Sequence, residues 1–486
     1  MSTESPTQDR RWLILAILGI AQLMVILDAT VVNVALPSAQ KALDFSNDNR
    51  QWIVTAYSLA FGGLLLLGGK ISDLFGRKWT FIIGLGGFAI ASAVGGAAQS
   101  FIMLAVARGF QGAFGALLAP AGLSLLTTTF TDPAERNRAF GIYGAIAGAG
   151  ASVGLLLGGV LTQYLSWRYC MFVNLAFAIV AITGGLALLE HHAHERKPHV
   201  DVPGAATITL GLFALVYGFS HAETSSWTNG LTLGFLAAGV ILLALFYVIE
   251  RRVGEPLLPL RVVTDRNRGA SFLAMLLASV AMYGVFLFLT YYLQRTQGYS
   301  PLKTGLAFLP LTGLIVIVSI VAQTLLTPRL GPRIMVATGM LFGAGGMVLL
   351  AQIGVSTHYA SGILPGLLLM AVGLGFIFAT AMNSATRGVE PGDSGVASAT
   401  VNAAQQVGGA LGTALLSTIA ASATTSFLSG KAPSPALIAQ APVHGYTVAF
   451  YVSAAIFVAG SLITGLLYER GAPELDPNAE PVLIGG

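Results

Sequence analysis

The chain of 486 residues is strongly apolar, with 55% hydrophobic and only 9% charged residues and a mean hydropathy of +0.76. A typical soluble domain has about 25% charged residues, so this composition excludes an ordinary soluble protein and indicates a membrane protein. The net charge of +4 does not indicate nucleic-acid binding, because basic residues in the loops of a membrane protein set its orientation. The single cysteine, Cys170, excludes an intramolecular disulfide.

Fourteen apolar stretches are long enough to cross a bilayer as helices, which takes about 20 residues. The first continues from Trp12 past Asp28 without a cleavage site, so it is interpreted as a span and not as a signal peptide. The sequence therefore predicts an all-α integral membrane protein with fourteen transmembrane helices. In chain order, the predicted spans are 12–36, 51–69, 79–98, 101–126, 139–163, 170–190, 203–222, 231–249, 269–293, 303–326, 334–354, 361–382, 396–424 and 446–468.

The basic residues predict the orientation of these spans. If the N-terminus is inside, the inner segments hold three times as many Lys and Arg residues as the outer ones. This excess follows the positive-inside rule. We therefore expect a multi-pass protein of the cell inner (plasma) membrane with both termini in the cytoplasm.

The spans divide into two halves with an insertion. Residues 1–195 are predicted to form an N-terminal six-helix bundle, 196–255 an inserted helix pair, and 256–486 a C-terminal six-helix bundle with a cytoplasmic tail. A short internal echo supports two repeats: Gly76 precedes Arg77 and Lys78 after the second span, and Gly331 precedes Arg333 after the tenth. Parallel repeats of this kind are a known transporter architecture.

Two charged residues lie well inside predicted spans, Asp28 in the first and Arg108 in the fourth. A charge at that depth costs at least about 2.5–3.5 kcal/mol, and such residues usually mark an ion or proton path. An aspartate can bind and release a proton as its hydration and its charged neighbours change. The alternative is a buried ion pair that only holds the helices together, and the sequence does not show whether the two residues meet.

Other polar residues in or near the spans are candidates for the lining of a substrate cavity, or for hydrogen bonds that hold helices together. They are Asn33, Tyr57, Gln111, Tyr291, Gln294, Asn402 and Gln405. Gln111 shares a helical face with Arg108 by its i, i+3 spacing. Glycines at positions 150, 154 and 158 form one stripe, with Gly159 beside it. Such a stripe permits close helix packing or forms a sliding surface.

Several kinds of chemistry have no support in the sequence. His191, His192, His194 and His199 lie in one polar loop, and spacing alone does not build a metal site there. No phosphate-binding glycine loop with its lysine is present, which argues against ATP-driven transport. No nucleophile and base form a recognisable set. We expect no metal, no other cofactor and no enzyme activity.

Three motifs resemble the major facilitator superfamily, and within it the fourteen-span drug:proton antiporters. The segment Gly69-Lys70-Ile71-Ser72-Asp73-Leu74-Phe75-Gly76-Arg77-Lys78 resembles the superfamily's loop between spans two and three. The segment Leu27-Asp28-Ala29-Thr30-Val31-Val32-Asn33-Val34-Ala35-Leu36-Pro37 resembles the first-span motif of the fourteen-span group. The segment Arg108-Gly109-Phe110-Gln111-Gly112 resembles the fourth-span motif linked to proton coupling.

The resemblance implies roles for particular residues. Asp28 and Arg108 would couple transport to protons, and a cytoplasmic latch would involve Gly69, Asp73, Gly76, Arg77 and Lys78. Leu155 stands where the antiporter motif of span five usually has proline, so that span is expected to kink less. Spans nine to fourteen contain no acidic residue, and by resemblance this favours neutral or monocationic substrates.

The function implied is a proton-coupled antiporter that exports lipophilic small molecules, such as drugs, dyes or secondary metabolites. Protons would be the coupling ion, and the partners would be the substrate and membrane lipid, with no nucleic acid and a monomeric chain. Two alternatives stay open: a nutrient importer or uniporter, and a transport-inactive membrane sensor.

Overall fold

The computed structural model describes residues 8–130, 132–190, 201–254, 256–387, 389, 394–432 and 434–470. Throughout these residues the regular structure is helical, without strands. The first eight helices are α1 (Gln8–Leu43), α2 (Asn47–Phe75), α3 (Arg77–Gly96), α4 (Phe101–Thr129), α5 (Pro133–Tyr164), α6 (Tyr169–Leu188), α7 (Val202–Thr224) and α8 (Gly230–Glu250).

The second part of the chain contains seven α-helices and three short π-helical turns. They are α9 (Leu260–Thr264), α10 (Arg266–Tyr291), η1 (Tyr292–Thr296), α11 (Pro301–Val321), η2 (Ala322–Leu326), α12 (Thr327–Leu350), η3 (Tyr359–Ile363), α13 (Leu364–Thr386), α14 (Ser394–Leu428) and α15 (Pro435–Leu467).

Each of the fourteen predicted stretches coincides with a long helix, and α9 is an additional short one. Several helices extend beyond the predicted limits, α1 and α2 among them. Within the described residues, twelve separate helical stretches are long and apolar enough to cross a membrane. One of these stretches, Pro301–Leu350, includes both α11 and α12. The α5 segment Ser152–Tyr164 is apolar but shorter, and it is not among the twelve. The fold is thus an all-α membrane fold, whereas the count of fourteen crossings stays a prediction.

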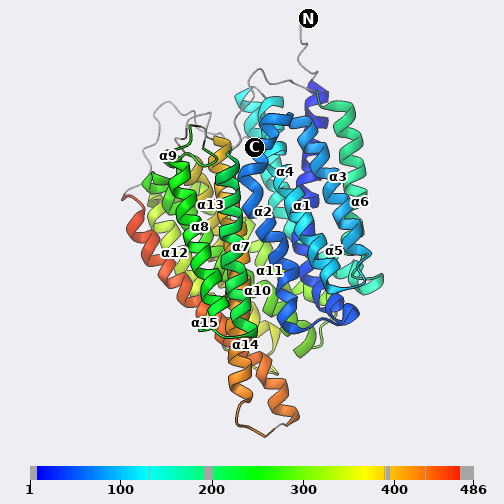
Figure 1. Ribbon diagram of the computed structural model, residues 1–486, viewed down its shortest axis with the longest axis vertical. Coiled ribbons are helices and arrows are strands. Elements are labelled where there is room, and N and C mark those ends of the chain that lie inside the picture. Colours follow the sequence, from blue (N-terminus) through cyan, green and yellow to red (C-terminus); the bar gives the residue numbers. More distant parts are fainter. Residues whose placement is uncertain are drawn as a thin grey trace, which may run out of the picture.

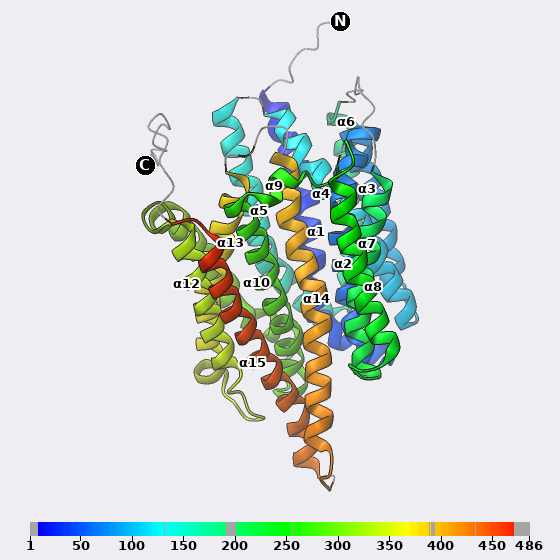
Figure 2. The same cartoon turned by 60° about the vertical axis from the view of Figure 1, so that its left-hand side comes forward.

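The long helices form two groups that pack mainly within themselves (Figures 1 and 2). In the first group, α1 packs against α5 and α6, and α4 packs against α2 and α3. In the second, α10 packs against α14 and α15, and α12 packs against α13 and α15. The two groups meet where α2 contacts α14 and where α5 contacts α11. These groups fall within the predicted domains, whose limits stay a prediction.

The α7–α8 pair lies beside this interface. Helix α7 packs against both α2 and α14, whereas α8 packs chiefly against α7 (Figure 1). Leu231, Val240 and Ile241 of α8 are exposed, as expected for side chains that face lipid tails. The pair therefore contacts both groups mainly through α7, and its status as an insertion stays a prediction.

The helix ends define two faces of the bundle. Helix α1 begins and α15 ends at the same face, here called the near face (Figure 2). The loop between α14 and α15 extends beyond the other helices at the opposite, far face. Two turns at the near face require glycine: Gly76 has φ 85° between α2 and α3, and Gly331 has φ 79° within α12. Only glycine adopts such angles at little cost, which explains the internal echo in the sequence.

The predicted glycine stripe of α5 packs tightly against α1. A Cβ at Gly150 would stand 3.0 Å from Ile26, one at Gly154 would collide with the hydroxyl of Thr30, and one at Gly158 would stand 2.9 Å from the Val31 carbonyl. Gly159 instead faces α11, where a Cβ would stand 2.7 Å from Leu302. These contacts agree with the packing interpretation of the stripe, and a sliding role stays a prediction.

Candidate functional site

The two charged residues predicted within the membrane lie in contact inside the first helix group. Asp28 is in the middle of α1 and is fully buried, and Arg108 of α4 is 1% exposed. Nη1 of Arg108 donates to Oδ2 of Asp28 over 2.5 Å. In a low-dielectric interior, neither charge is tolerated without such a partner. The ion pair therefore joins α1 to α4.

The other carboxylate oxygen of Asp28 accepts two further hydrogen bonds. Gln111 of α4 donates from Nε2 over 2.9 Å, and Asn174 of α6 donates from Nδ2 over 2.7 Å. An ionised carboxylate is an acceptor only, so three donors around its two oxygens satisfy the charged form. The three donors thus fix the Asp28 carboxyl group between α4 and α6.

Arg108 has additional partners besides Asp28. Its Nε donates to the Ile53 carbonyl of α2 over 3.2 Å, and its Nη1 also donates to Oε1 of Gln111 over 2.9 Å. The guanidinium lies 4.3 Å from the ring centre of Tyr57, which is a cation–π contact. The hydroxyl of Tyr57 is buried and has no hydrogen-bond partner among the described residues.

A second layer of hydrogen bonds fixes the amides that hold Asp28. The Ser92 hydroxyl of α3 accepts from Gln111 and from Asn174, each over 2.8 Å, and donates to the Met171 carbonyl over 2.9 Å. Four helices, α1, α3, α4 and α6, thereby converge on one carboxylate. The sequence analysis did not identify Ser92 or Asn174. Asn174 could have been identified, because it is an amide within the apolar span 170–190.

The seven predicted cavity residues lie in different surroundings. Gln111 and Tyr57 belong to the Asp28 site. The Asn33 amide donates to the Ala29 carbonyl of its own helix. The Asn402 amide likewise donates to the Ser398 carbonyl. Gln405 is half-buried on α14. Whether these residues line a path for substrate stays a prediction.

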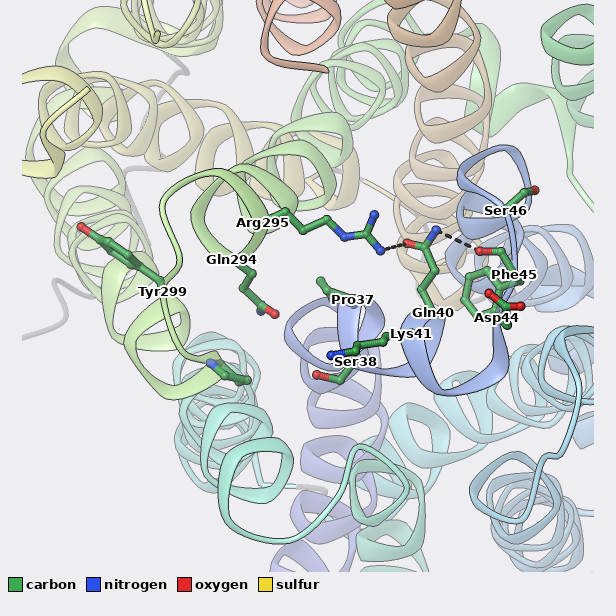
Figure 3. A pocket seen from close by; sticks show the side chains of 11 residues that line it. Pro37, Ser38, Gln40, Lys41, Asp44, Phe45, Ser46, Gln294, Arg295 and Tyr299 are labelled. Carbon is green, nitrogen blue, oxygen red and sulfur yellow. Dashed lines mark hydrogen bonds between the residues drawn. The ribbon is translucent and has the colours of Figure 1, made fainter. Parts of the chain in front are cut away.

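Gln294 lies at the far face in the wall of a cavity of about 590 Å³ (Figure 3), and Tyr291 contacts Gln40 in the same wall. Gln294 and Arg295 line this cavity together with Gln40 and Lys41 of α1. The Tyr291 hydroxyl donates to Oε1 of Gln40 over 2.7 Å, and Arg295 donates to the same oxygen over 2.9 Å. These bonds join the first helix group to the second at the far face.

Aromatic and amide contacts also join the two helix groups at the far face. The Tyr291 ring lies between two guanidinium groups, 4.4 Å from Arg50 of α2 and 5.1 Å from Arg295. Gln294 donates from Nε2 to the Val34 carbonyl of α1 over 2.9 Å. Tyr291 is therefore a buried contact between the two groups, while Gln294 both lines the far-face cavity and contacts α1.

The predicted latch residues cluster at the near face. Lys78 donates from Nζ to the carbonyls of Leu186 and Leu189 over 3.2 and 2.6 Å, so it ties the start of α3 to the end of α6. Gly76 supplies the turn, Arg77 begins α3, and Gly69 of α2 faces Pro120 of α4. The side chain of Asp73 lies outside the described residues, and a latch between Asp73 and Arg77 stays a prediction.

Two further expectations concern α5 and metals. Helix α5 is continuous from Pro133 to Tyr164, and the backbone around Leu155 lies against Gly305 of α11. Among the residues that the structure describes, no group of three or more His, Cys, Asp or Glu side chains could hold a metal ion. The predicted histidine-rich loop, 191–200, lies outside those residues.

Comparison with known proteins places the chain in a family. Residues 18–413 match the model of the Major Facilitator Superfamily. The chain belongs to the Major Facilitator Superfamily. It is therefore a transporter of that superfamily. It is 47% identical over 470 residues to the puromycin resistance protein of Streptomyces alboniger, covering 96% of this chain and 93% of that one.

Other known proteins are similar over most of the chain. The cephamycin export protein of Amycolatopsis lactamdurans is 36% identical over 410 residues, covering 83% of this chain and 84% of that one. Among solved structures, an auto-inhibited POT family peptide transporter matches with a TM-score of 0.67 at 18% identity, covering 97% of this chain and 99% of that one. A bacterial Spinster homologue in an inward-facing state matches with a TM-score of 0.66 at 16% identity, covering 95% and 98%. At these identities, the two structures show the shared fold alone.

Proposed function

We propose that this transporter is a proton-coupled antiporter that exports lipophilic small molecules by alternating access, with both termini in the cytoplasm. The observation that carries the proposal is Asp28, a fully buried carboxylate paired with Arg108 and held by the amides of Gln111 and Asn174. A buried acid inside a membrane bundle is costly, and such residues usually belong to an ion or proton path.

The hydrogen bonds around Asp28 suggest how proton binding is linked to a change of shape. All three partners are N–H donors aimed at the carboxylate oxygens. Oδ1 already accepts two of these hydrogen bonds, so a proton on Oδ1 would displace a donor, and a proton on Oδ2 would remove the charge that attracts Arg108. Because the donors come from α4 and α6, protonation of a residue on α1 alters the packing of three helices.

Arg108 has the role of a fixed positive charge in this mechanism. Arginine stays protonated under all physiological conditions, so Arg108 carries no proton itself. It pairs with Asp28, and its contacts with Ile53 and Tyr57 connect the pair to α2. Helix α2 in turn contacts α14 of the second group. This chain of contacts is a route from the proton site to the interface between the groups.

The relatives support export of small molecules. One is named for resistance to puromycin and another for export of cephamycin. One name gives resistance to an organic compound and the other gives export of one, which favours an exporter over a nutrient importer. The helices α10 to α15 contain no acidic residue, so we propose that the substrates are neutral or carry one positive charge.

Dye accumulation in inverted membrane vesicles tests the proposal. Vesicles with the wild-type protein are expected to accumulate a lipophilic monocationic dye, and an uncoupler should abolish the accumulation. The Asp28→Asn variant keeps the shape of the side chain but cannot ionise, and we expect it to abolish accumulation at an equal amount of folded protein. Uncoupler-sensitive accumulation by Asp28→Asn at the wild-type rate would refute the coupling role.

A further inference from the structure

A second pair of buried acidic side chains lies at the near face, where the α7–α8 pair meets the rest of the protein. Asp201 precedes α7 and Glu250 ends α8, and each residue is 4% exposed. Neither belongs to the Asp28 site, which is built from α1, α3, α4 and α6. We call these two residues the carboxyl pair.

Each member of the carboxyl pair uses one oxygen for a structural hydrogen bond. Oδ1 of Asp201 accepts from the Gly204 amide over 2.9 Å and so caps α7. Oε2 of Glu250 accepts from the Leu258 amide over 2.9 Å, which ties the end of α8 to the linker that leads to α9. The other two oxygens, Oδ2 of Asp201 and Oε1 of Glu250, are buried and have no partner among the described residues.

These two unpartnered oxygens point into the same space beside Gly204. A Cβ on Gly204 would collide with Oδ2 of Asp201 and would stand 2.9 Å from Oε1 of Glu250. The neighbouring carboxyl group of Asp201 acts electrostatically on Glu250. Two ionised carboxylates are acceptors only, so they repel one another at such range, and a proton on one of them removes the conflict.

The surroundings of the carboxyl pair offer no described cation in place of that proton. Asp201 is the charged side chain that acts on Glu250. Arg251 and Arg252 come directly after α8 and are exposed, and Arg251 lies over the Tyr247 ring. Lys70 of α2 is half-buried and has no described contact with the pair, and Arg261 of α9 is exposed and has an interaction of its own. Helix α14 contains no charged residue.

The linker held by Glu250 packs over the interface between the two helix groups. Leu257 is 2% exposed and forms a small apolar cluster with Leu66 of α2 and Ala205 of α7. Leu258 and Ala399 of α14 pack against the same cluster. The Glu250–Leu258 hydrogen bond therefore holds a segment that touches α2, α7 and α14 together.

We propose that Asp201 and Glu250 form a second proton-binding site, in which one proton is shared between Oδ2 of Asp201 and Oε1 of Glu250. The bound proton keeps Glu250 in place and thereby holds the linker at Leu258 against α2 and α14. When the proton leaves to water at the near face, two carboxylates remain, their repulsion turns Glu250 away, and the Leu258 amide is released. The site requires no substrate, so it does not depend on the proposed antiport.

A spin label on the linker reports this change directly. Gly254 is exposed and has open space around its Cα, so Gly254→Cys places a nitroxide on the linker without disturbing a contact. Cys170 is fully buried, and a sample without Gly254→Cys measures any label that reaches it. In lipid nanodiscs, the spectrum is recorded from about pH 5 to about pH 9, a range in which buried carboxyl groups with raised pKa values lose their proton.

The expected result is a single-proton transition. The ratio of mobile to immobile label should rise about tenfold per pH unit where the carboxyl pair loses its proton. Glu250→Gln should keep the low-pH spectrum throughout, because its amide can donate to Asp201 while its oxygen still accepts from Leu258. Asp265→Asn is the matched control: Asp265 also caps a helix at the near face, with a side chain that is 40% exposed, and this variant should titrate like the unmutated background.

Infrared spectra provide a second readout that does not depend on the label. The carbonyl band of a protonated carboxylic acid should disappear in Glu250→Gln and stay in Asp265→Asn. A label mobility that does not change with pH, or that follows pH equally in Glu250→Gln, would overturn the proposal. So would mobility that follows sodium concentration at constant pH, since the pair would then bind a metal cation.

Discussion

The two helix groups use the same turn and differ in their buried chemistry. Gly76 and Gly331 have nearly equal φ angles at the near face, each before basic residues. Inside the first group, however, Asp28 and Arg108 form a buried ion pair. In the second group, the described buried polar contacts are between uncharged side chains, such as Thr327 with Thr380.

The difference suggests a division of labour. A buried ionisable pair is costly and its geometry depends on protonation, so the first group is where a proton can change the structure. The second group has no acid in α10 to α15 and can change position without a charge change of its own. We propose that it follows the first group through the α2–α14 and α5–α11 contacts. Four substitutions test this division.

The largest effect is expected for Arg108→Ala. It leaves Asp28 buried without a counter-charge, and removal of one partner of a buried pair costs about 3–5 kcal/mol. We expect a large loss of thermal stability in detergent together with loss of transport. Thr380→Val removes a neutral buried hydroxyl from the second group and should retain most transport. Equal losses in both variants would contradict the division.

Asn174→Ala is expected to cost less. It removes a donor to Asp28 and a donor to Ser92, and an unsatisfied buried acceptor costs about 1–3 kcal/mol. Transport should weaken and its pH profile should shift, because the ionised form of Asp28 loses one hydrogen bond. Asn383→Ala serves as a control, since that amide is exposed and bonds to Gln323. An unchanged pH profile in Asn174→Ala would separate this amide from coupling.

Gly154→Ala tests the packing of α5 against α1. The added methyl group would collide with Thr30 two residues from Asp28, and overpacking typically costs about 1–3 kcal/mol. Gly313→Ala on α11 meets no atom within 4 Å and should be neutral. Melting temperatures of the two variants measure the difference. A stable Gly154→Ala with normal transport would argue that α1 and α5 separate easily.

Tyr291→Phe should have the smallest effect. It removes one hydrogen bond to Gln40, worth about 0.5–1.5 kcal/mol, while the ring stays between Arg50 and Arg295. The far face should open more often, so a cysteine probe at position 41 should become more reactive, with the near-face position 254 as reference. Unchanged reactivity at position 41 would show that the bond does not hold the far face closed.

Much of the fold follows from the sequence because hydrophobic length is a direct constraint in a bilayer. The fourteen apolar stretches coincide with long helices, and the turn glycines at 76 and 331 have the expected conformation. The helix ends at the faces were less predictable, since α1 and α2 continue past their apolar cores into polar segments. Polar helix ends carry no hydrophobic signal.

The site was predicted in part. Asp28 and Arg108 were found because a charge in an apolar span is conspicuous, but their contact depends on how α1 and α4 pack. Ser92 and Asn174 were missed because uncharged polar residues are common in membrane helices as packing contacts. Asp201 and Glu250 were missed for a different reason. They lie at helix ends, where acids are ordinary, and only the fold brings their oxygens together.

Proton release from reconstituted protein tests the central claim most directly. Purified wild-type protein and Asp28→Asn are placed in liposomes with a pH-sensitive dye, and a lipophilic monocation is added. The wild-type protein should release protons on addition of the cation, and Asp28→Asn should release none while it still binds the compound. Proton release by Asp28→Asn equal to that of the wild-type protein would contradict the assignment of Asp28 as the coupling carboxylate.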